Sequence, residues 1–304
     1  MGRSHINWPL YSNSLINRGK ITFWLSKDLS KGWYNKKKTG SRGASYTYSQ
    51  SAIEALSLIR FKFKLTLRET QGFALSLEEL MGLGVKIPNY STLGRRLKGC
   101  CQKLKAKILK DETIHVVVDS TGLKVFGEGE WKVRQHGYSK RRTWMKLHLA
   151  VNEANNQILS MVLTDNSYKD NEVFEELMDH VPGEIRQATG DGAYDAKNCW
   201  SWVDENGVRG VFPPRKGATL KNHGNAHAKP SQRDKLIRLR REVGKKKWKK
   251  KTKYSRRSLA ETAMYRFKTL LGENLSSRSG FNQLAEALIK CNILNQMPTP
   301  SVLN

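Results

Sequence analysis

Three acidic side chains, Asp119, Asp191 and Glu261, lie far apart in the sequence, in segments that could bring them together. Asp119 and Asp191 each come where a predicted β-strand stops, and residues at the carboxyl ends of sheet strands point into a crevice. Glu261 belongs to the stretch 254–268, whose apolar residues recur at helical spacing. Carboxylates are the ligands that Mg²⁺ prefers. Three converging carboxylates therefore predict a site for two divalent cations, which can drive in-line phosphoryl displacement.

Each of these carboxylates also has an ordinary structural explanation on its own, as a strand end, a turn residue or a solvated helix residue. Other acids compete with them. Asp195, four residues after Asp191, is predicted to cap the following helix and is the reserve catalytic candidate. Asp170 is predicted to cap a helix that begins near 172, and His148 is predicted to be a packed core histidine. The proposed site therefore depends on the three carboxylates as a set.

Cationic residues surround Glu261 in the sequence. Arg257 lies four residues before Glu261, on the same helix face one turn away. Lys268 lies two turns beyond it, and Tyr254 precedes both. A carboxylate flanked by cations can hold a metal ion while the cations bind a DNA backbone. The alternative is a pair of surface ion contacts worth less than about 1 kcal/mol.

The order Tyr254, Arg257, Glu261, Lys268, with two, three and six residues between them, resembles a known signature. It is the Tyr-Arg-Glu-Lys signature of bacterial insertion-sequence transposases of the DDE type. That resemblance implies that Tyr254, Arg257 and Lys268 contact DNA. It also implies a bacterial, cytoplasmic, nucleoid-associated protein.

Two further motifs carry the same resemblance. VVVDST around Asp119 and TGDGAYD around Asp191 resemble the other catalytic motifs of these transposases, and residues 111–295 carry the similarity best. The resemblance implies a ribonuclease-H-like core in which Asp119, Asp191 and Glu261 are catalytic and bind two Mg²⁺ ions, with Mn²⁺ as a possible substitute. It implies cutting and joining of double-stranded DNA at element ends and at a target. Because two ends must be joined, we expect a homodimer on DNA.

The whole chain carries a large positive charge. It has 54 lysine and arginine residues against 27 aspartate and glutamate residues, a formal net charge of +27. Such a charge repels itself unless a polyanion neutralises it, so nucleic acid is the expected partner. No apolar stretch approaches the ~18 residues of a membrane span, and we expect no membrane association. Four cysteines without zinc-site spacing, and an N-terminus without a signal-like apolar core, favour a reducing cytoplasm.

The N-terminal third divides into two parts. Residues 1–45 are a basic arm with interleaved aromatic residues, which would either contact nucleic acid or pack on the protein. Residues 46–110 are predicted to be a small helical domain, with a capping box at 66–69. Arg95 and Arg96 lie in its last helix, which in a helix-turn-helix arrangement would enter a DNA major groove. An ordinary three-helix bundle with solvated arginines is the alternative.

Residues 111–295 are predicted to form an α/β catalytic domain. Three antiparallel strands followed by parallel strands and helices are the order of a ribonuclease-H-like mixed sheet flanked by helices. The predicted strands are 114–118, 123–126, 144–151, 158–163, 188–191 and 208–212. A helix over 281–295 is predicted to close this core, and 296–304 form a tail.

A basic insert at about 213–253 interrupts the catalytic domain. Its densest part is Lys245, Lys246 and Lys247 followed by Trp248 and three more lysines. A run of this density is predicted not to pack, because it repels itself. Its position before Glu261 favours contact with DNA phosphates over simple solvation. Trp248 could stack on an unpaired base, a role that some members of the resembled family give to a tryptophan.

Three functional hypotheses follow. The first is a DNA transposase that uses metal ions to cut element ends and to transfer the freed 3′-hydroxyl into target DNA. The second is a non-enzymatic basic DNA-binding regulator whose carboxylates are incidental. The third is a structure-selective nuclease on the same fold, which would cut branched DNA without joining ends.

Overall fold

The chain consists of two compact units. The computed structural model describes residues 7–25, 29–36, 45–100, 103–106, 108, 113–125, 144–220 and 230–297. Residues Ala106–Arg266 form one unit, here the sheet unit, and Met1–Lys105 with Phe267–Asn304 form the other, here the helical unit. The change of unit lies close to the boundary expected near 110. The C-terminal segment expected to close the catalytic core belongs instead to the helical unit.

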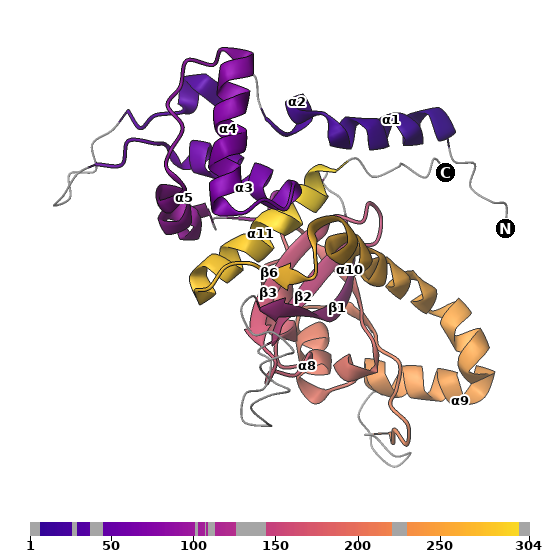
Figure 1. The fold of residues 1–304 in the computed structure, drawn as a ribbon. Helices are drawn as coiled ribbons and strands as arrows, with labels where there is room; N and C mark the ends of the chain where they lie inside the picture. Colours follow the sequence, from indigo (N-terminus) through magenta and orange to yellow (C-terminus); the bar gives the residue numbers. More distant parts are fainter. Residues whose placement is uncertain are drawn as a thin grey trace, which may run out of the picture. The chain divides into compact units, whose positions relative to one another are not determined.

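The sheet unit is built on one mixed sheet (Figure 1). Its strands lie in the order β3-β2-β1-β4-β5, in which β1 pairs antiparallel with β2 and β2 with β3, while β4 and β5 run parallel to β1. This topology is that of the ribonuclease-H-like fold. The bounds are β1 Ile114–Val125, β2 Trp144–Asn152, β3 Ile158–Asp165, β4 Ile185–Thr189 and β5 Arg209–Val211.

Strand β1 differs from the prediction, which had two short strands with Asp119 at the end of the first. It is a single strand, and its pairing with β2 continues without interruption from Val116 to Lys124. The apolar run stops at Val118 because burial changes there: Val116 to Val118 are fully buried and the next residues are half-buried. Asp119 therefore lies in mid-strand, opposite Leu149, rather than at a strand end.

A helical layer covers one face of the sheet. Helices α7 (Phe174–Asp179) and α8 (Lys197–Glu205) bury their apolar faces against side chains of β1 and β4. Aromatic rings fill this core, and Phe174 packs against the rings of Tyr194 and Phe212 at centroid distances of 5.7 and 5.6 Å. Burial of this apolar surface holds the two central strands, which carry Asp119 and precede Asp191, in a fixed relation.

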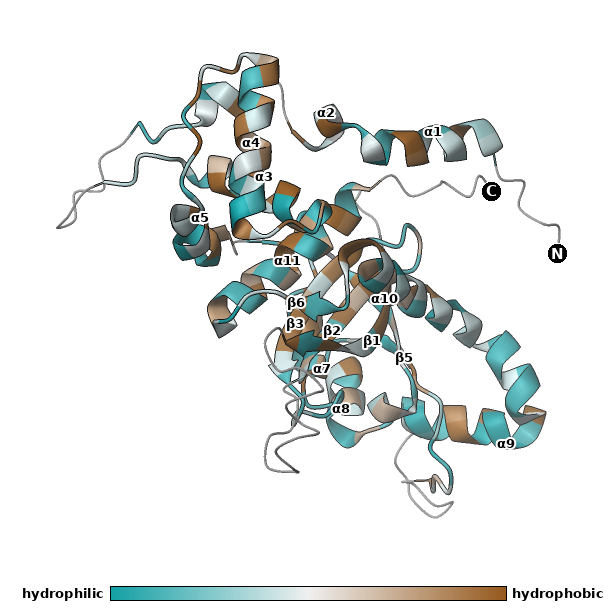
Figure 2. Cartoon of the chain, viewed as in Figure 1, coloured by the Kyte–Doolittle hydropathy of each residue, from teal (hydrophilic) through white to brown (hydrophobic). Residues whose placement is uncertain are grey.

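The described part of the basic insert contains a long helix, and its dense lysine run packs through one buried side chain, which corrects the expectation that the run cannot pack. Helix α9 (Gln232–Lys251) is two helical segments joined at Gly244, whose φ of 75° and ψ of 164° break the helix. Figure 2 shows α9 as mainly hydrophilic, and Figure 1 shows the sharp bend. Ile237 in the first segment and Trp248 in the second are buried, at 2% and 1% exposure. Burial of these two apolar side chains packs the two segments of α9 onto the protein, although most of their other residues are charged.

The helical unit follows the predicted pattern of three helices after residue 49. The predicted capping box is confirmed: Glu69 N donates to Thr66 Oγ1, and Thr66 N donates to the Glu69 carboxylate. The C-terminal helix packs on the first of the three predicted helices. The elements are α1 Trp8–Gly19, α2 Ile21–Trp24, η1 Leu29–Gly32, α3 Gln50–Lys62, α4 Leu67–Met81, α5 Tyr90–Arg96, η2 Leu97–Cys100, β6 Asn274–Leu275 and α11 Gly280–Gln296.

Aromatic residues of the N-terminal arm pack on the protein where the structure describes them. Trp24 and Trp33 are buried, at 6% and 3% exposure, and the Trp33 indole donates to the Lys86 carbonyl at 2.8 Å. Trp8 is exposed. Packing, one of the two alternatives for these rings, is thus the observed arrangement for Trp24 and Trp33. Among the described residues, no helix is both long and apolar enough to cross a membrane.

Candidate active site

Parallel pairing of β1 with β4 brings Asp119 and Asp191 together. Val117 of β1 lies opposite Thr189 of β4. Asp119 follows Val117 by two residues within β1, and Asp191 follows Thr189 by two residues, in extended backbone just past the end of β4. Neighbouring strands lie about 4.8 Å apart. The charge of Asp191 acts on Asp119, so the two carboxylates lie within electrostatic range of each other.

Asp191 is held by the turn that follows β4. It caps the 3-10 turn η3 (Gly192–Tyr194), and its Oδ1 accepts a hydrogen bond from the Ala193 amide at 2.8 Å. The turn requires a glycine at 190, since a Cβ there would lie 2.5 Å from the Tyr194 ring and 3.0 Å from Val118. Asp191 is thus placed by the backbone of a tight, well-packed corner.

Arg257 links Glu261 to Asp119. The 3-10 turn η4 (Tyr254–Arg257) leads into helix α10 (Ser258–Leu271), and Glu261 lies in the first turn of α10. Arg257 Nη1 donates to Asp119 Oδ2 at 3.1 Å, and Arg257 Nη2 pairs with the Glu261 carboxylate. One guanidinium therefore joins carboxylates that are far apart in the chain. The predicted contact between Arg257 and Glu261, one turn apart, is present.

The electrostatics agree with three converging acids. Burial raises the pKa of Asp119, and the charges of Asp191 and Glu261 raise it further, against the opposing effects of the Ser120 amide and Arg257. Burial also raises the pKa of Tyr254, on which the same three carboxylates act. Asp191 and Glu261 therefore lie within electrostatic range of Asp119, and all three acids lie within range of Tyr254.

Two competing residues take part in a polar cluster beside the site. Asp170 was expected to cap a helix, but Val173 occupies the N-cap of α7. The Asp170 carboxylate instead pairs with Lys146 at 2.8 Å. His148 is fully buried as expected, hydrogen-bonded to Thr164, and burial lowers its pKa to about 4. His148 lies across from Ser120 on the neighbouring strand, so this cluster supports the strand that carries Asp119.

Asp195, the reserve candidate, is fully engaged elsewhere. Its side chain is buried, and both of its oxygens accept hydrogen bonds from Trp200, Arg215 and Arg233. Few acceptor positions remain for a metal ion. Asp191 accepts one hydrogen bond, at Oδ1 from the Ala193 amide, so we keep it as the ligand candidate.

The DNA-contact candidates differ in exposure. Lys245, Lys246 and Lys247 are exposed on the second segment of α9. Trp248 is not: its ring is internal and lies 5.5 Å from the Tyr254 ring. This differs from the expectation of base stacking, because a buried indole offers no face to a base. The signal for this burial is composition: Trp248 is the one apolar residue in the lysine run 245–251.

Three predicted DNA-contact residues remain to be described: Arg95, Arg96 and Lys268. Arg95 is exposed on α5. Arg96 is occupied within the helical unit, since it donates to the Tyr48 carbonyl and to Gln50 Oε1 at 3.1 Å. The predicted contact of Arg96 with DNA would require it to keep or exchange these bonds, and it stays a prediction. Lys268 lies two turns beyond Glu261 on α10 and is half-buried.

The donor set suits a hard divalent cation, because Asp119, Asp191 and Glu261 offer only carboxylate oxygens. Asp119 and Glu261 already share one positive charge, that of Arg257. Within the described part of the chain, no three His, Cys, Asp or Glu side chains lie close enough to form a metal centre as they stand. The three carboxylates suit a divalent cation chemically, and Arg257 occupies the space between Asp119 and Glu261.

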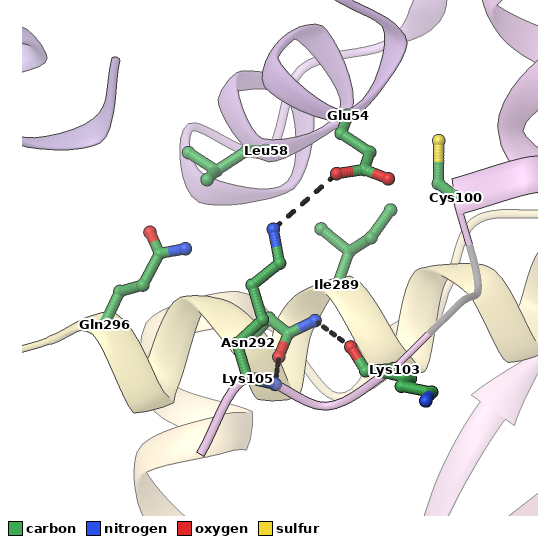
Figure 3. Close-up of a pocket in the computed structure, with 8 residues that line it drawn as sticks. All are labelled: Glu54, Leu58, Cys100, Lys103, Lys105, Ile289, Asn292 and Gln296. Atoms are coloured by element: carbon green, nitrogen blue, oxygen red, sulfur yellow. Dashed lines mark hydrogen bonds and ion pairs between the residues drawn. The ribbon is translucent and has the colours of Figure 1, made fainter. Parts of the chain in front are cut away.

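A pocket of about 280 Å³ lies elsewhere, in the helical unit (Figure 3). It lies between α3 and α11, where Lys105 Nζ is 3.7 Å from Glu54 Oε2 and Asn292 bonds the backbone at 103 and 105. Glu54 is the one acid in its lining. This pocket lacks the carboxylate set of the candidate site.

Comparisons with known proteins identify the family of this chain. Two family models, each described as a transposase DDE domain, match residues 16–128 and 110–296. The second alone spans more than half of the chain and contains all three carboxylates. A cryo-EM structure of a piggyBac transposase synaptic complex with hairpin DNA aligns over 93% of this chain and 73% of that chain, with 12% identity and a TM-score of 0.43. The family matches show that this chain belongs to the DDE transposases and is a DNA transposase.

Proposed function

We propose that Asp119, Asp191 and Glu261 form the site that cuts DNA at insertion-element ends and joins the freed 3′-hydroxyl to target DNA. The observation that supports this most directly is the double ion pair of Arg257 with Asp119 and Glu261, beside Asp191. It shows two distant acids gathered around one cation. DDE transposases generally depend on divalent metals; Mg²⁺, or Mn²⁺ in its place, would activate the attacking oxygen and stabilise the leaving oxygen.

In this proposal the acidic residues bind metal and the neighbouring residues bind the DNA backbone. Asp119, Asp191 and Glu261 supply the oxygen ligands. Arg257 exchanges its carboxylate partners for a DNA phosphate, since guanidinium groups bind both anions in the same bidentate manner. Tyr254 and Lys268 extend this contact along the backbone of the bound strand.

DNA binding outside the site would rest on exposed cations. Lys245, Lys246 and Lys247 on α9 and Arg95 on α5 are the exposed members of the predicted contact set. Contacts of this kind release counterions, so binding should weaken steeply as salt increases. Joining two ends to one target requires at least two protomers, and we propose a homodimer on DNA. A chain acting on DNA in this way would reside with the chromosome, in the cytoplasm of a bacterium.

The test uses purified full-length protein, MgCl₂ and linear DNA that carries the element's ends. Wild-type protein should give both cut and joined products. Asp119→Ala, Asp191→Ala and Glu261→Ala should each abolish cutting while gel-shift binding of the ends survives. Asp165→Ala is the matched control, because Asp165 is an exposed acid at the end of β3 whose carboxylate bonds Ser167.

The outcomes separate the hypotheses. A variant that retains full strand transfer would remove its residue from the site. Cut products without joined products would indicate a nuclease activity and contradict strand transfer. Binding without any product, in Mg²⁺ and in Mn²⁺, would contradict the proposed chemistry for this chain.

A further inference from the structure

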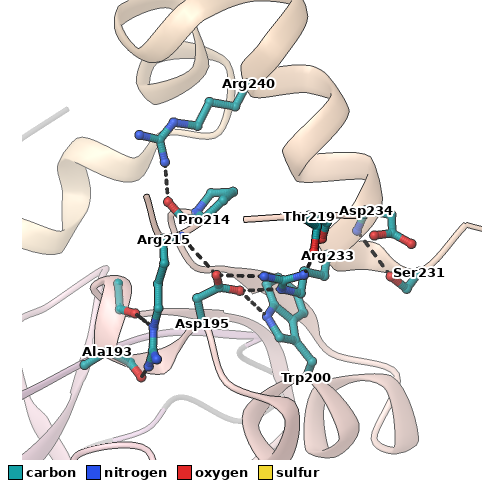
Figure 4. Close-up of polar contacts among 11 residues, drawn as sticks. Ala193, Asp195, Trp200, Pro214, Arg215, Thr219, Ser231, Arg233, Asp234 and Arg240 are labelled. Atoms are coloured by element: carbon teal, nitrogen blue, oxygen red, sulfur yellow. Dashed lines mark hydrogen bonds and ion pairs between the residues drawn. The ribbon is translucent and has the colours of Figure 1, made fainter. Parts of the chain in front are cut away.

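A buried carboxylate, Asp195, lies at the centre of a hydrogen-bond network next to the candidate site (Figure 4). Its Oδ1 accepts from Trp200 Nε1 at 2.9 Å and from Arg233 Nε at 2.7 Å. Its Oδ2 accepts from the Arg215 amide at 3.0 Å and from Arg233 Nη2 at 3.2 Å. The side chain of Asp195 is 0% exposed. Buried ionised groups are rare unless they are satisfied in this way.

Two of the three donor residues belong to the basic insert. Arg215 follows β5, and Arg233 lies in the first turn of α9. Arg233 also donates through Nη1 to the Thr219 carbonyl at 3.0 Å. Asp195 therefore ties together the point where the insert leaves the sheet and the point where its long helix begins.

The same network holds the turn that carries Asp191. The Arg215 guanidinium donates to the carbonyls of Gly192 and Ala193, at 2.9 and 2.8 Å. Ala193 in turn donates its amide to Asp191 Oδ1. A short chain of hydrogen bonds thus leads from α9 through Arg233, Asp195 and Arg215 to the backbone around Asp191.

We propose that Asp195 is a positioning residue for the transposition reaction. Resting on the proposed function, this role couples the placement of the DNA-contacting insert to the placement of Asp191. Asp195 does not touch DNA or metal in this role, because its oxygens are committed to Trp200, Arg215 and Arg233. Displacement of a reacting group by about 1 Å can lower a rate by about 10²-fold, so a loosened Asp191 turn would slow cutting strongly.

The first test separates the rate from the binding. Asp195→Asn and Arg233→Gln should each lower the cutting rate constant at saturating end DNA by 10- to 100-fold. The double variant should lose no more than either single variant, because one ion pair is removed in each case. Arg209→Gln is the matched control: it removes one charge from an exposed position on β5, and its rate constant should equal that of wild type.

The second test separates positioning from metal ligation. Asp191→Cys should lose cutting in Mg²⁺ and regain it in part in Mn²⁺, because the thiolate sulfur is a softer ligand. Asp195→Cys should show no such recovery. Titration of Mn²⁺ into the end-bound protein, followed by electron paramagnetic resonance, should show about tenfold weaker binding for Asp195→Asn. A role in folding alone would lower the melting temperature and leave Mn²⁺ affinity and the rate constant unchanged.

The results have clear consequences. Wild-type rates and Mn²⁺ affinity for Asp195→Asn and Arg233→Gln would overturn the positioning role and leave the transposase function intact. Multiplicative losses in the double variant, or Mn²⁺ recovery of Asp195→Cys, would also overturn it. If wild-type protein binds ends but does not cut, the proposed function fails, and the Mn²⁺ affinities still decide the role of Asp195.

Discussion

Arg257 Nη1 lies 3.1 Å from Asp119 Oδ2, so the Arg257 guanidinium forms an ion pair with one of the carboxylates expected to bind metal. The same guanidinium pairs with Glu261. In the proposed site, metal ions and Arg257 would compete for these oxygens. A DNA phosphate that draws Arg257 away would free both acids, which links metal binding to DNA binding.

Arg257→Gln should accordingly bind Mn²⁺ more tightly than wild type in the absence of DNA, because the competing charge is gone. Cutting should fall, since the phosphate contact is lost with it. Isothermal titration of Mn²⁺ measures the first effect. Arg256→Gln is the control, because Arg256 pairs with Glu153 at 3.5 Å and not with the site. Equal Mn²⁺ affinity in Arg257→Gln and wild type would contradict the competition.

Trp248 should behave as a core residue rather than as a base-stacking residue. Its ring is buried against Tyr254, so Trp248→Ala should destabilise the sheet unit by about 3 to 5 kcal/mol. Trp248→Phe should retain most of the stability and cutting. Thermal denaturation and cutting assays check both. Unchanged melting with lost cutting, restored by DNA that is already unpaired, would instead support stacking.

Gly244 should tolerate no side chain without a change in α9. Its backbone conformation is nearly exclusive to glycine, so Gly244→Ala should cost about 1 to 3 kcal/mol or straighten the helix. Gly72 is the control: it lies inside α4 with open space around it, and Gly72→Ala should be neutral or stabilise by about 0.5 to 1 kcal/mol. Chemical denaturation and circular dichroism measure both. Equal effects of the two substitutions would contradict this reasoning.

The buried ion pair of the helical unit should make its stability sensitive to acid. Glu286 Oε1 lies 2.9 Å from Lys290 Nζ, with side chains 1% and 4% exposed. Burial acts to raise the pKa of Glu286, but Lys290 and hydrogen bonds from Ser276 and Ser277 outweigh it, and the pKa falls below its ordinary 4.5. Glu286→Gln should cost about 3 to 5 kcal/mol at pH 7, because Lys290 stays buried without its partner.

This contribution is complete above pH 4.5 and is lost as pH falls through the lowered folded pKa of Glu286. The gap in melting temperature between wild type and Glu286→Gln should therefore shrink below pH 4.5. Glu54→Gln is the control, since the partly exposed pair with Lys105 should be worth less than about 1 kcal/mol. A gap that stays constant down to pH 2 would show that the pair contributes nothing through its charge.

Local patterns were sufficient where neighbouring residues decide the structure. The capping box at Thr66 and Glu69 and the contact of Arg257 with Glu261 each involve groups three or four residues apart, and both are present. The ribonuclease-H-like sheet was expected chiefly from the family resemblance, whereas the apolar runs divided the single strand β1 into two. Where Asp119 lies within β1 did not follow, because a change from buried to half-buried looks the same in sequence as the end of a strand.

The sequence by itself was sufficient for the fold class and the family, and it predicted the three acids, since motif spacing and apolar periodicity are local properties of the chain. Only the tertiary structure showed that Asp195 is buried in a hydrogen-bond network, that Trp248 is internal and that Arg257 bridges Asp119 and Glu261. The physical reason is that the contacts of Asp195 and Arg257 join residues 38 and 138 positions apart, which meet only through packing of the sheet and its insert.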